Sequence, residues 1–202
     1  MHNSIVKAPE AAMNTPAEKS IAATGMQQQS FTIEFRKSGL LTHQLATSLF
    51  LHADRRKAFS FFEDPRNLFE ITPEWLDFRM LGPEQSEVHE GAEFDYTIKW
   101  LGLTFRWKSR IINYHPPDSF TDIQLTGPYR SWEHLHVFEE AEGGTIMKDI
   151  VTYKLPLAAL IIYRPVIKKQ LRNIFLYRAS RIDEWVRNKM VSRGRAQSLS
   201  GR

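Results

Sequence analysis

The sequence contains no cysteine in its 202 residues. This absence excludes disulfide bonds, thiolate nucleophiles and zinc–thiolate sites, and it fits a reducing compartment. The chain also has no apolar run of the ~20 residues that a membrane-spanning helix needs. Its N-terminus has no positively charged start followed by an apolar stretch, as a secretory signal would have. We therefore expect a cytoplasmic protein without stable membrane insertion.

Several familiar functional motifs are also missing. The sequence has no nucleophile elbow, phosphate-binding loop, dinucleotide fingerprint or metalloprotease helix, so no cofactor and no covalent catalysis are expected. The formal net charge is +4, but no basic helix or aromatic RNA-binding signature accompanies it, and we expect no nucleic-acid partner. The oligomeric state is left open by the sequence.

The composition divides the chain into one domain and two tails. Hydrophobic residues make up 42% and charged residues 25%, which is typical of a globular protein. Residues 1–37 are rich in Ala, Gln, Ser, Thr and Pro and predict a disordered leader, in which the alternating residues 31–35 allow one short strand. Residues 38–191 predict one folded domain, and residues 192–202 a flexible basic tail.

The apolar periodicity within the domain predicts an α+β protein. Alternation over residues 41–51 predicts a first strand, and Asp54 and Pro65 are placed to begin two short helices. After Pro156 the period becomes helical, from about Pro165 to Met190. Such a helix is nearly 40 Å long at ~1.5 Å per residue, enough to cross a whole sheet. Further strands are expected at residues 76–81, 94–100, 104–114, 120–126, 132–139 and 145–153.

One block of motifs resembles a known superfamily. It comprises Pro116–Gln124, Gly127–Tyr129, Trp132–Phe138 and Gly144–Pro156, and it is similar to an uncharacterised bacterial branch of the START/polyketide-cyclase superfamily, also called SRPBCC. The likeness covers roughly residues 40–190. It implies the helix-grip fold, in which a bent antiparallel sheet wraps around a long C-terminal helix, and a cavity for an apolar or amphipathic molecule. Because members include lipid carriers, hormone-binding proteins and polyketide cyclases, the resemblance implies no single activity.

Two histidines form the centre of a predicted polar cluster. Strand alternation places His134 and His136 on one face. If the last hairpin turns near Gly143, His136 lies opposite Asp149, and an Asp149–His136 hydrogen bond is expected. If the preceding turn is centred near Pro128, Asp122 lies opposite His134. The same register puts Gln124 opposite Trp132. One face of three strands is thus predicted to carry Asp122, Gln124, His134, His136 and Asp149.

Three interpretations of this cluster stay open. It could line the cavity and offer a His–Asp pair for acid–base chemistry, with His136, Asp149 and His134 as candidate catalytic residues. It could bind a divalent metal, but the spacing of His134 and His136 also arises by chance, and a catalytic zinc needs three ligands plus water; no metal is therefore expected. It could also be a set of satisfied polar pairs that fixes the sheet register.

The expected function is binding of a hydrophobic or amphipathic small molecule, with transport or sequestration as variants. The alternative is a cyclase- or dehydratase-type enzyme that uses the His–Asp pair. Trp75 lies where the resemblance places the mouth of the pocket, whereas the aromatic residues of the central strands could be either core or ligand contacts. The predicted ligand-binding residues are Trp75, Phe94, Tyr96, Trp107, Asp122, Gln124, Trp132, His134, His136 and Asp149.

Overall fold

The computed structural model describes residues 31–81, 87–100, 102–161 and 166–200. These residues form one antiparallel sheet in the order β1-β2-β8-β7-β6-β5-β4-β3. The strands are β1 (Phe31–Lys37), β2 (Thr42–Leu51), β3 (Arg79–Met80), β4 (Glu93–Trp100), β5 (Leu103–His115), β6 (Ser119–Thr126), β7 (Ser131–Ala141) and β8 (Gly144–Lys154). The helical elements are α1 (Arg55–Glu63), α2 (Asn67–Glu70), η1 (Glu74–Leu76), η2 (Leu157–Leu160) and α3 (Lys168–Ser200).

Alternation of buried and more exposed residues is regular in the middle of the sheet. In β2 and β8, every second residue is buried over the whole strand, because successive side chains of a strand point to opposite faces. Leu45 and Leu49 of β2, and Met147 and Val151 of β8, all lie on the buried face. The strands predicted from this pattern are confirmed here.

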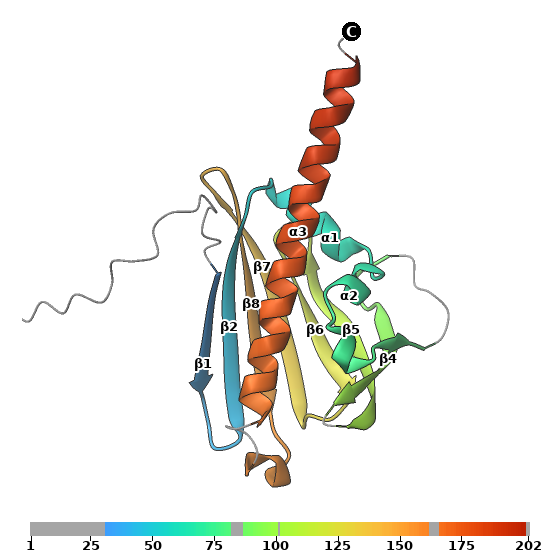
Figure 1. Ribbon diagram of the computed structural model, residues 1–202. Helices are drawn as coiled ribbons and strands as arrows, with labels where there is room; N and C mark the ends of the chain where they lie inside the picture. The colour runs from blue at the N-terminus through green and yellow to red at the C-terminus, as the bar shows by residue number, and fades with distance from the viewer. Residues whose placement is uncertain (1–30, 82–86, 101, 162–165, 201–202) are drawn as a thin grey trace, which may run out of the picture.

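Helix α3 lies across one face of the sheet, with β1 and β2 on one side and β4 and β5 on the other (Figure 1). Its buried residues include Leu171, Phe175, Ile182 and Val186, which belong to the predicted apolar stripe. The sheet and this helix together confirm the α+β, helix-grip architecture. No helix among the described residues is long and apolar enough to cross a membrane.

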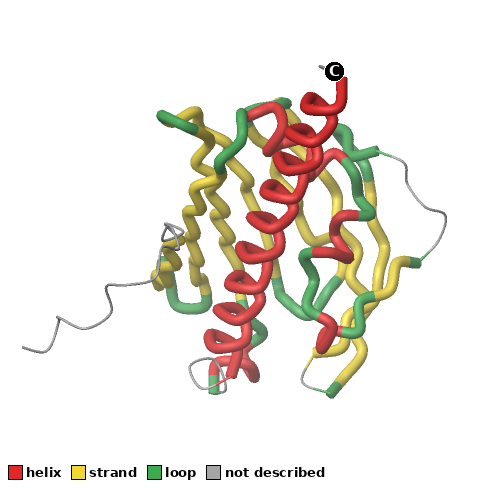
Figure 2. Tube along the Cα trace, turned by 45° about the horizontal axis from the view of Figure 1, so that its top comes forward, coloured by secondary structure: helices red, strands yellow, loops and turns green. Residues whose placement is uncertain are grey.

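The short helices α1 and α2 follow β2 and lie beside α3 in both views (Figures 1 and 2). The N-cap prediction for α1 is confirmed, since the Asp54 side chain accepts a hydrogen bond of 2.8 Å from the backbone N–H of Lys57. Phe59 and Phe61 of α1 are buried in the core. Phe62 is only half-buried and faces the cavity described below.

Three predicted boundaries need correction. The sheet begins at Phe31, because β1 pairs with β2 along its whole length; the folded domain therefore starts before residue 38, while residues 1–30 lie outside the described part. The strand predicted at 76–81 is reduced to β3, because Asp77 has a positive φ of 41° that ends the extended backbone. The structure continues α3 as a helix through residues 192–200, which the sequence predicted as a flexible tail. The predicted start of this helix at Pro165 lies outside the described residues.

The interior consists of two apolar clusters that α3 connects. One cluster includes Phe59, Phe138 and Met147 and receives Ile182 from the second half of the helix. The other includes Leu45, Val151 and Tyr153 and receives Phe175 from the first half. A cavity opens beside the helix, where the sheet, α1, α2 and η1 face one another.

Candidate functional site

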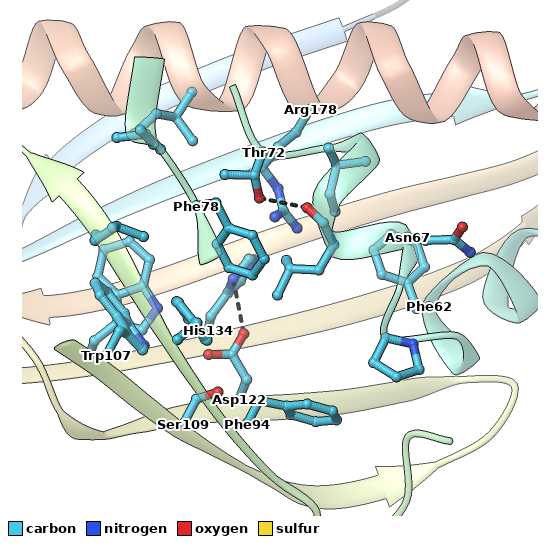
Figure 3. A pocket seen from close by; sticks show the side chains of 18 of the residues that line it. Phe62, Asn67, Thr72, Phe78, Phe94, Trp107, Ser109, Asp122, His134 and Arg178 are labelled. Atoms are coloured by element: carbon cyan, nitrogen blue, oxygen red, sulfur yellow. Dashed lines mark hydrogen bonds and ion pairs between the residues drawn. The ribbon is translucent and has the colours of Figure 1, made fainter. Parts of the chain in front are cut away.

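The cavity has a volume of about 200 Å³ and a mostly aromatic and aliphatic lining. Its walls come from the segment between α1 and β3, from strands β4 to β7 and from the first half of α3. Figure 3 shows side chains from these elements converging on one space, with α3 above them. Of the ten residues predicted to bind a ligand, seven line it: Phe94, Tyr96, Trp107, Asp122, Trp132, His134 and His136.

Aromatic rings form one end of the cavity. The rings of Tyr96 and Trp107 are stacked, with centroids 6.1 Å apart, and Trp132 meets Trp107 edge to face at 5.4 Å. These contacts connect β4, β5 and β7. Tyr96, Trp107 and Trp132 therefore pack against one another and also line the cavity.

The strand registers bring the predicted polar cluster together. His136 pairs with Asp149 and His134 with Val151 across β7 and β8. Asp122 pairs with His134 across β6 and β7. All of these pairings agree with the predicted register. Asp122, His134, His136 and Asp149 consequently share the helix-covered face of three adjacent strands.

Asp149 lies behind the two histidines and does not line the cavity. Its Oδ1 atom is 2.9 Å from Nε2 of His134 and 2.9 Å from Nδ1 of His136. Its Oδ2 atom accepts a hydrogen bond of 3.1 Å from the Thr47 hydroxyl on β2. Asp149 therefore lies close to both rings, on the side away from the cavity.

The hydrogen bond predicted between Asp149 and His136 is instead made with His134. The His134 contact has hydrogen-bond geometry, whereas Nδ1 of His136 is equally close but badly aligned and makes no hydrogen bond with the described residues. The strand register alone does not determine which histidine makes the hydrogen bond. His134 is the diagonal neighbour of Asp149, but its Nε2 atom lies at the far end of the ring and reaches the same carboxylate oxygen.

Asp122 faces the histidines from the cavity side. Its Oδ2 atom is 3.4 Å from Nδ1 of His134 and 3.6 Å from Nε2 of His136. The Asp122 side chain is 22% exposed, against 8% for Asp149. Asp122 is thus the carboxylate of this cluster that a molecule in the cavity can reach, and the labelled His134–Asp122 pair in Figure 3 lies at the cavity wall.

The pKa values of three groups in the cluster are shifted from their ordinary values. Burial opposes the charged form of each group, but the neighbouring histidines outweigh it and hold the pKa of Asp122 and of Asp149 far below the usual range. Burial lowers the pKa of His134, yet hydrogen bonding to the two carboxylates outweighs this and leaves that pKa raised. Two ionised carboxylates are therefore held in the protein interior beside the cavity.

Two buried donors in the cavity wall have no hydrogen-bond partner among the described residues. These are Nε1 of Trp107 and Nε of Arg178. Arg178 comes from α3 and points toward the cavity (Figure 3). It was not among the predicted site residues, although its position on the apolar stripe of the helix is a usable signal, because a cation on a buried stripe has a ligand or an acid to meet.

Two predicted ligand-binding residues lie elsewhere. Gln124 is absent from the cavity wall because its amide turns back to the β6–β7 connection, where Nε2 donates a 2.8 Å hydrogen bond to the carbonyl of Tyr129. A Cβ at Gly127 would lie 2.3 Å from the Gln124 amide oxygen, so a larger residue there would displace this side chain. Trp75 is 52% exposed and packs edge to face on Tyr177 of α3, outside the lining.

Comparisons with known proteins define the class of fold. No protein-family model and no curated protein matches the sequence. Among solved structures, many share the fold at low sequence identity, including an ARO/CYC protein and uncharacterised bacterial proteins. The chain has the helix-grip fold that the resemblance of its motifs implied.

Three solved structures illustrate the likeness. Protein TTHA0849 from Thermus thermophilus is 15% identical with a TM-score of 0.58, over 72% of this chain and 98% of that one. Protein Ms6760 from Mycobacterium smegmatis is 16% identical with a TM-score of 0.56, over 78% and 98%. The di-domain ARO/CYC StfQ of the steffimycin biosynthetic pathway is 15% identical with a TM-score of 0.58, over 74% of this chain and 52% of that one. At these identities the likeness concerns the fold alone.

Proposed function

We propose that the protein binds a small apolar or amphipathic molecule that carries at least one oxygen acceptor. The observation that supports this most is the cavity itself, in which an aromatic wall is combined with two unpaired donors, Trp107 and Arg178. Ligand sites are commonly apolar hollows with a few polar groups that orient the ligand. A carbonyl or carboxylate oxygen would satisfy either donor.

The energetics favour such a ligand. A buried donor without a partner costs about 1–3 kcal/mol, and a ligand oxygen that pairs with Trp107 or Arg178 recovers part of that cost. An engineered apolar cavity of about 150 Å³ holds benzene. At about 200 Å³, this cavity accepts a molecule with one or two rings, or an alkyl chain of similar volume, whose polar end reaches Arg178.

The first experiment is native mass spectrometry of the purified protein, followed by organic extraction and identification of any bound compound. A reproducible apolar adduct with an oxygen function supports the proposal. N-phenyl-1-naphthylamine, which fluoresces in apolar sites, provides a second readout. Ser109 is buried and lines the cavity, so Ser109→Leu should fill it and abolish the fluorescence gain.

Ser131→Leu is the matched control, because Ser131 is exposed at the start of β7. This variant should bind the probe like the unmodified protein. The proposal fails if no compound is recovered and the probe does not bind. It also fails if Ser109→Leu and Ser131→Leu bind the probe equally well.

A second candidate function is acid–base catalysis of the cyclase or dehydratase type on the bound molecule. It is favoured by the 2.9 Å His134–Asp149 hydrogen bond together with the ring nitrogens that face the cavity beside Asp122. A His–Asp pair fixes the histidine tautomer and suits it to proton transfer. Liquid chromatography with mass spectrometry of a recovered compound should then show conversion by the unmodified protein and its loss in Asp149→Asn. Absence of any conversion rejects this candidate.

A further inference from the structure

Three potential metal ligands meet at the cavity wall. They are the carboxylate of Asp122 and one imidazole nitrogen each from His134 and His136, all within 4.8 Å of one another. The side chains come from two adjacent strands, β6 and β7, whose backbones are fixed by the ladder between them. His136 is further held in place by Phe120, whose ring stacks on it at 4.2 Å. The three groups are therefore held in position before anything binds.

The separations suit a tetrahedral cation. Ligands placed ~2.1 Å from one ion in a tetrahedron are about 3.4 Å apart. Oδ2 of Asp122 lies 3.4 Å from Nδ1 of His134 and 3.6 Å from Nε2 of His136. These distances exceed those of ordinary hydrogen bonds. They leave room for an ion between the Asp122 carboxylate and each ring, and the three ligand atoms lie within 4.8 Å of one another.

The other nitrogen of each ring faces Asp149. Nε2 of His134 hydrogen-bonds to its Oδ1, and Nδ1 of His136 lies at the same distance from that oxygen. A carboxylate that accepts the outer N–H of a histidine leaves the inner nitrogen as a lone pair, which is the usual outer-shell arrangement of metal-binding histidines. Asp149, itself held by Thr47, is therefore a positioning residue.

The charges of the cluster also favour a cation. With Asp149 accepting from His134, the lone pair on Nδ1 of a neutral His134 points at the carboxylate of Asp122, and two electron-rich groups then face each other in a buried site. Only a proton or a metal ion between them relieves this repulsion. When both imidazoles are neutral, the two carboxylates leave a charge of −2, which a divalent ion neutralises.

We propose that Asp122, His134 and His136 bind a divalent transition-metal ion of the Zn²⁺ or Fe²⁺ type, with an open coordination position that faces the cavity. Imidazole ligands favour such ions over Mg²⁺ or Ca²⁺, which prefer oxygen. The open position would be available to water or to an oxygen of a molecule in the cavity, because the lining surrounds the three ligands. This inference goes beyond small-molecule binding and does not depend on it.

The test is metal uptake by protein that has been stripped with a chelator and then dialysed. Titration with Co²⁺ should give one equivalent of binding and the visible absorption bands of a tetrahedral ion, and Zn²⁺ should displace it. Asp122→Asn and His136→Gln each remove a ligand and should weaken Zn²⁺ binding by more than about 100-fold, measured by calorimetry. Asp149→Asn should weaken it by about 10–100-fold, as removal of an outer-shell carboxylate does.

His89→Gln is the matched control, because His89 is exposed and remote in sequence from the cluster; this variant should bind Zn²⁺ like the unmodified protein. Binding that His136→Gln retains, or no uptake by the unmodified protein, overturns the proposal. Circular dichroism checks that each variant folds. If Asp122→Asn does not fold, X-ray absorption of the Zn²⁺-loaded unmodified protein decides, since two imidazole ligands support the site and fewer reject it. Probe binding by the stripped protein tests the cavity separately.

Discussion

The orientation of two imidazole rings determines what the polar cluster can do. His134 and His136 each face Asp149 with one nitrogen and Asp122 with the other. One carboxylate is screened from the cavity and the other borders it. The two rings therefore lie between the buried carboxylate of Asp149 and the carboxylate of Asp122 at the cavity wall. Asp149 affects the proton or metal affinity of the nitrogens that face Asp122.

Asp149→Asn should destabilise the protein by about 3 kcal/mol, because it removes the charged partner of a buried group. The expected result is a lower urea midpoint in chelator-containing buffer, with an unchanged slope. Glu133→Gln is the control, since Glu133 is exposed on the neighbouring strand and the same change of acid to amide should shift the midpoint little. Equal midpoints for the two variants would contradict the assigned role of Asp149.

In the metal-free protein, the stabilisation by this cluster should decrease both at low pH and at high pH. The pKa of Asp149 is lowered in the folded protein from its ordinary 3.8, so its contribution is present above about 3.8 and is lost as the pH falls through the folded pKa. The pKa of His134 is raised from 6.5, so its contribution is complete below 6.5 and is lost as the pH rises through the folded pKa. The difference in Tm between the unmodified protein and Asp149→Asn should be largest between about pH 3.8 and pH 6.5. A difference that is constant from pH 3 to pH 9 would refute it.

At the scale of elements, β2 and β8 approach so closely at one point that there is no room for a side chain. Gly144 begins β8 beside the end of β2, where a Cβ would lie 2.1 Å from the carbonyl oxygen of Leu51. No side chain can occupy that position unless the backbone moves. The register of β8, and with it the position of Asp149 against β7, depends on this approach.

Gly144→Ala should cost about 1–3 kcal/mol, the range expected for overpacking. Gly39→Ala is the control, because its nearest neighbour is the side chain of Thr42 at 3.3 Å, which can turn away. Thermal unfolding of both variants measures the difference. If Gly144→Ala is as stable as Gly39→Ala, the end of β2 is free to shift and the fixed register described here is wrong.

At the scale of the whole molecule, α3 connects the two apolar clusters across the face of the sheet (Figure 1). The same helix also closes the cavity, since Phe175 meets His134 edge to face at 5.6 Å and Arg178 lies among the lining residues. Stability and the binding site therefore share one element. Detachment of α3 would open the cavity and expose both clusters.

Unfolding should consequently be one cooperative transition. Phe175→Ala and Ile182→Ala each remove a buried side chain of α3, one from each cluster, and each should cost about 2–5 kcal/mol. Both variants should show coincident transitions by tryptophan fluorescence and by circular dichroism. Two separated transitions in either variant would show that the clusters unfold independently.

Local patterns in the sequence predicted most of the elements and much of the cluster. Alternation in β2 and β8 and the stripe of α3 are visible because each follows from the geometry of a single element. The pairing of His136 with Asp149 was also predictable, because the two strands are joined by a short turn and the register follows from the number of residues on each side of it. Alternation also allowed the strand at residues 31–35, but not its place in the domain, because an edge strand depends on its partner. The short length of β3 was not predictable, because the positive φ of Asp77 is not encoded by a period.

The sequence by itself determined the strand order of the last hairpins, the face on which His134 and His136 lie, and the α+β class of the fold. Only the tertiary structure decided which ring nitrogen meets which carboxylate, that Gln124 turns to the β6–β7 connection, and that Arg178 reaches the cavity. The physical reason is one of range. Periodicity and turn length act between neighbours in the chain, whereas side-chain rotation and the packing of α3 on the sheet depend on residues that are distant in sequence and meet only in the folded protein.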